Sequence, residues 1–583
     1  MTSAIGLYAL ATAISFYLIY KALVRLQLSR AKHPSLRGHS NWSRRVARLV
    51  PFFSYDEAGF FASDGAPASV VQKRRNAIRV LQSNAEQQSP ETLAHCQAIQ
   101  NSVSDVRFTN RYRVPFPYSQ QLPDCLRSGS MADETRGSQI RDLDGNWRYD
   151  LSGSYGVNVF GYDFYKRCME ESLAQTRALG PVLGAYHPLI AENVDMIRQI
   201  SGLDEVSFHM SGTEAVMQAV RLARYHTGKT HLVRFCGAYH GWWDGVQPGI
   251  GNTRKARDVY TLADLSEQTL HILRTRNDIA CVLINPLQAF HPNSDSPSDT
   301  ALIASDRTSG FDKQSYVNWL ARVREVCCQR GIVLIFDEVF TGFRLAYRGA
   351  QEFYGVQADL VTYGKTLGGG LPVGVLAGTH ALMKRFKDDQ PVNVSFARGT
   401  FNSHPYVMGT MNVFLKRIRQ PDIQRQYRES ENLWERRVAR FNQCLEAESL
   451  PLRITNIHSI LSVLYTKPSR YNWMFQFYLR QAGLELSWTG TGRLIMSYSY
   501  TDEEFSEVIE RFVAAAHHMQ ADGWWWQSPA LTNKAIKRQF LVDMLSARFP
   551  FLAGSLPGPL VTHPGNTGPA MVSDQEDYSG KTG

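Results

Sequence analysis

The sequence predicts an α/β fold, with a mostly parallel central sheet in a large domain and a smaller α+β domain formed by N- and C-terminal segments. From residue 180 to about residue 411, helical segments alternate with the apolar runs EVSFHM, THLVRF, ACVLIN, IVLIFDEV and ADLVTYG. Such alternation is typical of βαβ units. Mixed segments flank this region on both sides. A chain of 583 residues is also too long for one core, so more than one domain is expected.

The flanking segments have patterns of their own. The run ASVVQKRRNAIRVLQSNAEQQ predicts an amphipathic helix, and Asp144-Gly145 predicts a hairpin turn. SILSVLYT predicts a strand and DEEFSEVIERFVAAAHHM a helix. The predicted organisation is an anchor with a basic flank over 1–32, a helical extension over 33–135, small-domain segments over 136–179 and 416–527, the large domain over 180–415, and a disordered tail rich in Gly, Pro and polar residues over 528–583.

The N-terminus predicts contact with a membrane. The apolar run 4–20 is followed by eight Lys or Arg and no acid between residues 21 and 50, which account for most of the net charge of +10. A basic flank on the C-terminal side of a single-pass anchor places the bulk of the chain on the cytoplasmic side. A peripheral amphipathic helix and a buried N-terminal helix are the alternatives. The basic run fits an anionic lipid surface better than nucleic acid, so no nucleic-acid partner is expected.

Cysteine spacing excludes two other classes of structure. The eight cysteines include no CxxC pair and no regular spacing. A disulfide framework and a metal site are therefore not expected, and a reducing compartment is favoured.

The candidate site residues follow the predicted strands, where ligands bind in parallel sheets. Ser211-Gly212-Thr213 opens a helix and could bind an anion through free backbone N–H groups, or could be an ordinary helix cap with Glu214. Tyr239 could stack on a planar ring or pack in the core. His240 could transfer protons or hydrogen-bond a loop, and the loop is favoured.

A carboxylate pair and a lysine follow two further strands. Asp337 and Glu338 end IVLIFDEVF, and because side chains alternate along a strand, one of them is expected to enter a given cleft. Lys365 precedes a Gly-rich turn that lacks Walker-loop spacing, which leaves a Schiff-base lysine. A phosphate cradle, a stacking aromatic, a strand-end carboxylate and a strand-end lysine together are what pyridoxal phosphate (PLP) requires.

Residues 140–411 resemble the class III aminotransferases of PLP fold type I, and most of all the glutamate-1-semialdehyde 2,1-aminomutase branch. The matching motifs are DLDGNWRYDLSGSYG, MSGTEAVMQAVRLAR, YHGWWDG, LIFDEVFTGFR, YGKTLGGGLPVG and GTFNSHP. The resemblance implies that Lys365 is the Schiff-base lysine and Asp337 the partner of the pyridine nitrogen. It also implies a phosphate cradle around Ser211, Gly212 and Thr213, a ring-binding loop at Tyr239 and His240, and a homodimer in which Thr400 reaches the neighbouring subunit's phosphate.

The sequence departs from the family pattern near the substrate. Asn285 stands where the family usually has glutamate, and Phe340 stands where the branch that uses ω-amino acids typically has glutamine. The aminomutase's SPVR motif is missing. Arg107, Arg111 or Arg113 could replace its arginine, although a solvated basic face is favoured. The insertion at 291–316 could form a lid.

The resemblance implies a PLP-dependent aminotransferase that moves an amino group from an amino acid to an aldehyde or ketone, possibly a hydrophobic or carrier-bound one, by a ping-pong mechanism. The alternative is intramolecular transfer by a 2,1-aminomutase, which retains the amine within one substrate. A membrane-tethered scaffold with an inactive PLP fold is a minor alternative, against which the intact Lys365 and Asp337 argue.

Overall fold

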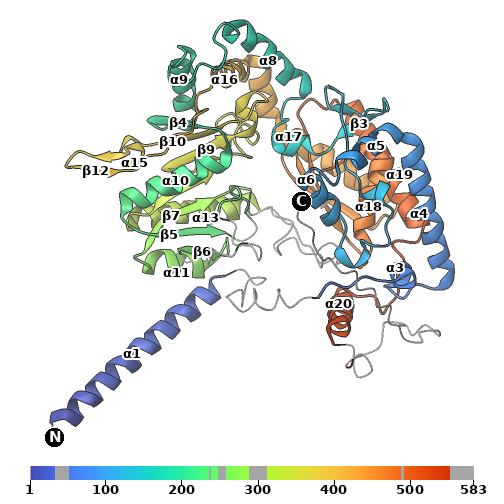
Figure 1. Cartoon of the computed structure of the whole chain (residues 1–583), viewed down its shortest axis with the longest axis horizontal. Coiled ribbons are helices and arrows are strands. Elements are labelled where there is room, and N and C mark those ends of the chain that lie inside the picture. The colour runs from blue at the N-terminus through green and yellow to red at the C-terminus, as the bar shows by residue number, and fades with distance from the viewer. Residues whose placement is uncertain are drawn as a thin grey trace, which may run out of the picture.

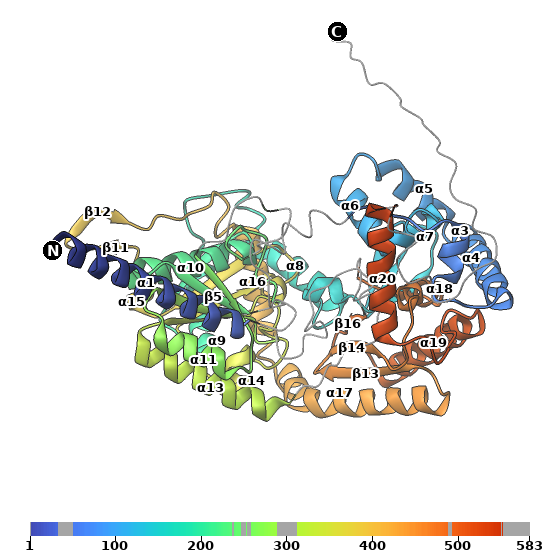
Figure 2. The same ribbon diagram turned by 90° about the horizontal axis from the view of Figure 1, so that it is seen from below.

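The computed structural model describes residues 2–32, 51–235, 238–246, 252, 258–287, 312–487, 492–549 and 551. They form two lobes that lie side by side in both views (Figures 1 and 2). The large lobe, green and yellow, is built on a seven-stranded sheet. The second lobe combines blue N-terminal helices with orange C-terminal strands and helices.

The sheet of the large lobe has the strand order β4-β10-β9-β8-β7-β5-β6. Its strands are β4 (Glu205–His209), β5 (His231–Phe235), β6 (Val259–Leu262), β7 (Ile279–Ile284), β8 (Val333–Asp337), β9 (Leu360–Gly364) and β10 (Gly374–Gly378). Neighbouring strands from β9 through β6 pair in parallel. Of the strands described in this sheet, β10 alone runs antiparallel to both its neighbours, so the mostly parallel sheet predicted from the sequence is confirmed.

Helices cover both faces of this sheet. They are α8 (Tyr162–Thr176), α9 (Leu189–Ser201), α10 (Gly212–Thr227), α11 (Glu267–Thr275), α13 (Lys313–Arg330), α14 (Gly349–Tyr354), α15 (His380–Met383) and α16 (Pro405–Arg417). Four of them end at glycines with left-handed backbone, which satisfy the last carbonyls of a helix without a Cβ clash: Gly202, Gly228, Gly331 and Gly355.

Alternate residues of β8 pack on opposite faces of the sheet. Val333 and Ile335 belong to the core beneath α10, whereas Leu334 and Phe336 belong to the larger core that includes α13. Because the side-chain period of a strand is two, Asp337 continues the face of Ile335. The next residue, Glu338, lies on the opposite side, as the sequence predicts.

The second lobe contains two small sheets. One has the order β1-β2-β3-β15 and the other β13-β14-β16. The bounds are β1 (Glu134–Arg136), β2 (Gln139–Arg141), β3 (Trp147–Asp150), β13 (Leu452–Ile457), β14 (Ile460–Tyr465), β15 (Leu484–Glu485) and β16 (Arg493–Ile495), with helices α17 (Pro421–Ala447), α18 (Phe475–Gln481) and α19 (Asp502–Ala521). The hairpin predicted at Asp144-Gly145 joins β2 to β3 and is confirmed.

The N-terminal helices complete the core of this second lobe. They are α3 (Glu57–Ala62), α4 (Ala68–Gln88), α5 (Pro90–Ile99), α6 (Ser104–Tyr112) and α7 (Asp124–Arg127). The ring of Phe60 lies 5.8 Å from that of Tyr118 and 6.5 Å from that of Trp524. All three side chains are fully buried, so residues far apart in the sequence share one core.

The first helix, α1 (Thr2–Arg30), projects from the large lobe (Figure 1). Its segment Tyr8–Arg30 is long and apolar enough to cross a membrane, and none of its most apolar stretch is buried within the chain. The alternative of a buried N-terminal helix is therefore wrong. At its base, the carbonyl of Ala31 accepts a hydrogen bond of 2.8 Å from the amide of Ala263. The rest of the basic flank, residues 33–50, lies outside the described residues.

The prediction of a disordered tail is wrong over part of its length. Helix α20 (Asn533–Arg548) begins at Thr532, whose side chain accepts a hydrogen bond from the amide of Ala535. Its buried residues Ile536 and Phe540 are four positions apart and share one helix face, which packs onto Phe53. This short amphipathic pattern is hidden among polar residues in the sequence. The tail beyond residue 551 lies outside the described residues.

Candidate functional site

Strands β8 and β9 bring Asp337 and Lys365 to the same edge of the sheet. The two strands pair in parallel, with Asp337 opposite Thr362. Lys365 directly follows β9 and has a left-handed backbone, with φ of 48°. This conformation is uncommon outside glycine and is typical of functional sites. The carboxylate and the amine therefore meet where parallel sheets bind ligands.

The environment of Lys365 favours its neutral form. Burial lowers the pKa of the amine and nearby Arg344 lowers it further, while the charge of Asp337 opposes the shift. The Nζ atom lies 5.2 Å from the centre of the Phe340 ring. A neutral amine is the form that attacks a carbonyl carbon, so the site prepares Lys365 to act as a nucleophile.

Three groups hold the carboxylate of Asp337. His240 Nδ1 lies 2.7 Å from Oδ2, and the Thr362 hydroxyl and the Val339 amide donate to Oδ1 over 3.1 and 3.2 Å. An ionised carboxylate only accepts hydrogen bonds, so Nδ1 carries the proton in the His240–Asp337 pair. The loop hydrogen bond favoured for His240 from the sequence is therefore wrong, because the ring bonds across the site to the strand.

The N-terminus of α10 forms a tight cradle beside this carboxylate. The side chain of Ser211 caps the helix by accepting from the amide of Glu214, so the ordinary cap role applies to Ser211. The first N–H groups of a helix lack intrahelical partners, which leaves those of Gly212 and Thr213 for an anion. A Cβ on Gly374 would lie 1.9 Å from the carbonyl oxygen of Ser211, and one on Gly241 would lie 2.5 Å from Thr213 Oγ1. Glycine at both positions lets the backbone close around the cradle.

Tyr239 does not pack in the core. It precedes His240, and its side chain is 61% exposed. Since His240 is anchored to Asp337, the exposed ring of Tyr239 is held near the Asp337 carboxylate. The core-packing alternative for Tyr239 is wrong, and the ring has a free face for stacking.

Thr400 lies apart from the other predicted site residues. It is exposed on the segment between β12 (Gln390–Val394) and α16, and no hydrogen bond joins it to Lys365 or Asp337 in the described part of the chain. The fold of one chain therefore leaves Thr400 at the surface.

Glu338 has a structural role. It is buried, and its carboxylate accepts from the amides of Ala350 and Gln351 at the start of α14, over 2.5 and 3.3 Å. Burial raises the pKa of Glu338 to about 8, against the effect of these two donors. The sequence-based separation of Asp337 from Glu338 is confirmed.

Arg344 is a site component that the sequence does not reveal. Its fully buried guanidinium donates to Ser459 Oγ and to the carbonyl of Met496, over 2.8 and 2.9 Å, and reaches the carbonyl of Gly156 at 3.4 Å. Arg344 therefore ties the loop after β8 to two segments of the second lobe. The one sequence feature that could have pointed to Arg344 is its position seven residues after Asp337. No local pattern, however, indicates partners so distant in sequence.

The arginines proposed near the substrate separate into two environments. Arg107 and Arg111 of α6 are exposed, which agrees with a solvated basic face. Arg113 is 2% exposed, so that interpretation is wrong for this residue. Asn285 follows β7 and accepts a hydrogen bond of 3.1 Å from the Leu287 amide. Most of the insertion, residues 291–311, lies outside the described residues.

Comparisons with known proteins agree with this geometry. The family model of class III aminotransferases matches residues 127–516. A glutamate-1-semialdehyde 2,1-aminomutase of Alkaliphilus oremlandii is 35% identical over 289 residues, which cover 47% of this chain and 62% of that protein, less than two thirds of its length. The corresponding enzyme of Desulfotalea psychrophila is 31% identical, with 60% and 80% covered.

The fold also has solved counterparts. A glutamate-1-semialdehyde aminomutase from Pseudomonas aeruginosa in complex with PMP superposes with a TM-score of 0.61 at 17% identity, covering 77% of this chain and 99% of that one. At this identity the likeness concerns the fold alone. With a family model that spans well over half of the sequence, the chain belongs to the class III aminotransferases, and within them it is similar to the glutamate-1-semialdehyde aminomutase branch.

Proposed function

We propose that this enzyme moves an amino group from an amino acid donor to an aldehyde or ketone acceptor in a ping-pong reaction. The donor leaves as a 2-oxo acid and the acceptor leaves as an amine, so atoms balance over the two halves. The observation that carries the proposal is the juxtaposition of Lys365, whose pKa is lowered, with Asp337 at the ends of β9 and β8. The chain belongs to the class III aminotransferases, a family that uses PLP as its cofactor.

The residues of the site fit this cofactor. The cradle at Gly212 and Thr213 would hold the phosphate, Asp337 the ring nitrogen, and Lys365 the aldehyde carbon. When bound, PLP supplies an electron sink for the pair released at the substrate carbon. Lys365 would carry the proton to and from that carbon. His240 and Thr362 fix the Asp337 carboxylate, which would keep the ring nitrogen protonated.

The second candidate is intramolecular transfer of the aminomutase type. Relatives bearing that name favour it, as does Phe340 in the place of glutamine. Asn285 instead of the family glutamate, and the missing SPVR arginine, favour a different substrate. The two reactions differ in whether a separate 2-oxo acid is released.

A donor screen tests the proposal. The full chain loaded with PLP is mixed with single amino acids, and the visible absorbance of the lysine-linked cofactor is followed. We expect one class of amino acid to convert it to the pyridoxamine form with release of a 2-oxo acid. Lys365→Ala should lose the lysine-linked band and slow conversion at least ~10²–10⁴-fold, the usual contribution of a positioned acid–base group. Conversion that proceeds equally in Lys365→Ala would overturn the proposal.

We also propose a homodimer with shared active sites. Strand β12 and the segment carrying Thr400 expose large apolar side chains: Val392 is 93% exposed, Phe396 72% and Phe401 50%. Grouped apolar exposure of this kind marks protein interfaces. A second chain would cover these residues and bring its Thr400 to the phosphate end of the first chain's site.

The apolar helix α1 supports a further proposal, a single-pass anchor that leaves the catalytic lobes in the cytoplasm. Peripheral binding of this helix to the membrane surface is the alternative. For the anchor, washing membranes with carbonate should not release the protein. Release of the protein by carbonate would favour peripheral binding of α1.

For the homodimer, light scattering of the purified full chain in detergent should give the mass of two chains. A monomeric protein that binds PLP at full occupancy would exclude the shared active site.

A further inference from the structure

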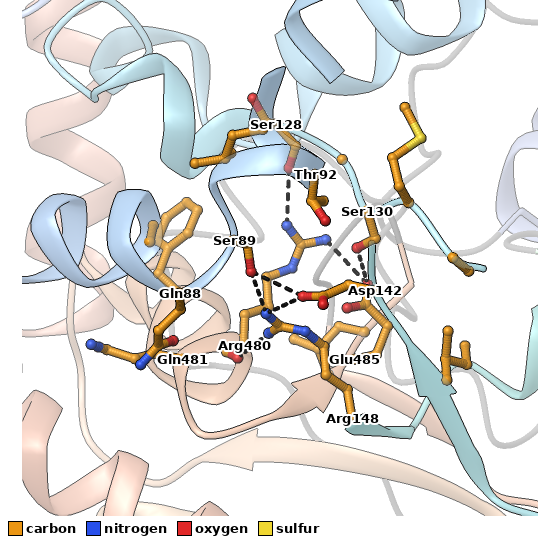
Figure 3. Close-up of a pocket in the computed structure, with 18 of the residues that line it drawn as sticks. Gln88, Ser89, Thr92, Ser128, Ser130, Asp142, Arg148, Arg480, Gln481 and Glu485 are labelled. Atoms are coloured by element: carbon orange, nitrogen blue, oxygen red, sulfur yellow. Dashed lines mark hydrogen bonds and ion pairs between the residues drawn. The ribbon is translucent and has the colours of Figure 1, made fainter. Parts of the chain in front are cut away.

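A cavity lies between the N-terminal helices and the small sheets of the second lobe (Figure 3). It encloses about 340 Å³, within the ~300–1,000 Å³ typical of small-molecule sites. Its walls are largely apolar and include Leu81, Ala85, Leu93, Leu126, Phe477 and Leu486. The first four precede residue 127, where the match to the family model begins. One wall therefore comes from residues that precede the part of the chain matched by the family model.

The polar groups in the cavity neutralise one another. Arg148 pairs with Asp142 at 3.1 Å, and Arg480 lies 3.7 Å from Glu485. Ser89 and Ser130 donate to these two carboxylates over 2.9 and 2.6 Å, and Figure 3 shows the whole set bonded together at the centre of the pocket. Two arginines face two carboxylates. The cavity thus offers no uncompensated charge to a second carboxylate or a phosphate, and its remaining surface suits a neutral apolar ligand.

One end of the cavity approaches the lysine site. Ser154 and Tyr155 line it, and both have positive φ, 45° and 56°. The next residue, Gly156, packs so closely on Phe340 that a Cβ there would lie 2.3 Å from its ring. The Phe340 ring also lies close to Lys365, whose Nζ is 5.2 Å from the ring centre. The end of the cavity at Tyr155 is thus linked to the amine through Gly156 and the Phe340 ring.

We propose that this cavity binds the hydrocarbon chain of the carbonyl acceptor, with the carbonyl group directed past Tyr155 toward Lys365. The inference rests on the proposed function and names its acceptor class: aliphatic aldehydes or ketones with a long unbranched chain. Each methylene moved from water into the apolar cavity should increase affinity about fourfold. Short carbonyl compounds would fill the lysine site alone and leave the cavity empty.

Binding can be tested without catalysis. Octan-1-ol and butan-1-ol, unreactive analogues of the acceptor, are titrated calorimetrically into the PLP-loaded full chain in lipid nanodiscs. We expect octanol to bind once per chain and at least 50-fold more tightly than butanol. Ala85→Trp, which fills the cavity from α4, should abolish octanol binding. Val80→Trp is the matched control, because Val80 lies on the same helix but is 56% exposed and does not line the cavity.

Kinetics then separate this inference from the proposed function. With octanal and butanal as acceptors, Ala85→Trp should lower kcat/KM for octanal at least 50-fold, leave butanal within twofold, and leave the donor half-reaction unchanged. Leu93→Trp, from α5, replaces Ala85→Trp if that variant does not fold. Absence of octanol binding in the wild type, or an equal effect on both aldehydes, would overturn the inference. Loss of the donor half-reaction in the wild type would overturn the proposed function, while octanol binding would still test the cavity.

Discussion

Asp337→Asn should slow the donor half-reaction by roughly 10²–10⁴-fold, because breaking a buried charge pair costs ~3–5 kcal/mol and each 1.36 kcal/mol is tenfold in rate. The carboxylate is 4% exposed and held on both oxygens by His240, Thr362 and the backbone. A neutral amide in the same place would keep the packing but would no longer hold the proton of the ring nitrogen. Stopped-flow absorbance with the donor found in the screen measures the rate.

The control for Asp337→Asn is a substitution of Asp359, which lies at the opposite end of the same two strands. Asp359 precedes β9 and accepts a hydrogen bond of 2.8 Å from the Leu334 amide. Asp359→Asn should leave the donor rate within about twofold. An N-methylated PLP, whose ring charge needs no proton, should restore part of the rate in Asp337→Asn and none in Lys365→Ala. If it restores nothing, the role of Asp337 at the ring nitrogen is wrong.

The same substitution has a pH signature. The charge of Asp337 raises the pKa of Lys365, in opposition to burial, which lowers it below 10.5. Removing that charge should therefore lower the pKa of Lys365 further. Because the neutral amine attacks PLP, the uptake of PLP by the apoenzyme should rise with pH through this pKa. We expect the half-rise below pH 10.5 in the wild type and at still lower pH in Asp337→Asn. A shift to higher pH would contradict the electrostatic coupling.

Local patterns in the sequence were sufficient for much of the fold. The run predicted as an amphipathic helix is α4, Ala68–Gln88, and SILSVLYT contains β14. Two strands of the large sheet, β6 and β10, escaped notice. Strand β10 has the sequence GVLAG, and its glycines and alanine lack the β-branched or aromatic side chains that mark a strand. Its place between β4 and β9 comes from long-range pairing.

The residues of the site also divide into those that local patterns predict and those that long-range contacts bring together. Lys365 and Asp337 could be predicted because strand ends converge in any parallel sheet, and that rule needs no side-chain detail. The bond from His240 to Asp337 spans 97 residues, and that from Arg344 to Met496 spans 152. Nothing in a local pattern encodes such pairs, since they depend on how loops fold over the sheet. For this reason the cavity walled by α4 and α5 also became visible only in the structure.

The N-terminal helices are held by a buried ion pair, and breaking it should strongly destabilise the second lobe. Arg74 of α4 bonds both oxygens of Asp64, over 2.9 and 2.6 Å, and also donates to the carbonyls of Phe61 and Gly523. The exposed fractions of the two side chains are 0% and 1%. Asp64→Ala leaves a buried cation without its counter-charge, at a cost of ~3–5 kcal/mol in the free energy of unfolding. Urea titration followed by tryptophan fluorescence reports this cost, because Trp524 lies 5.4 Å from the Arg74 guanidinium.

An adjacent pair supplies the control. Arg75 of α4 pairs with Glu57 of α3, but 33% and 61% of these side chains are exposed, so Glu57→Ala should cost only ~0–1 kcal/mol. The double variant Asp64→Leu/Arg74→Met removes both charges and should be more stable than Asp64→Ala alone. Equal losses in Asp64→Ala and Glu57→Ala would show that the buried pair does not hold α4. Because α4 also carries Leu81 and Ala85 of the cavity, Asp64→Ala should weaken octanol binding while leaving the donor half-reaction, in the other lobe, unchanged.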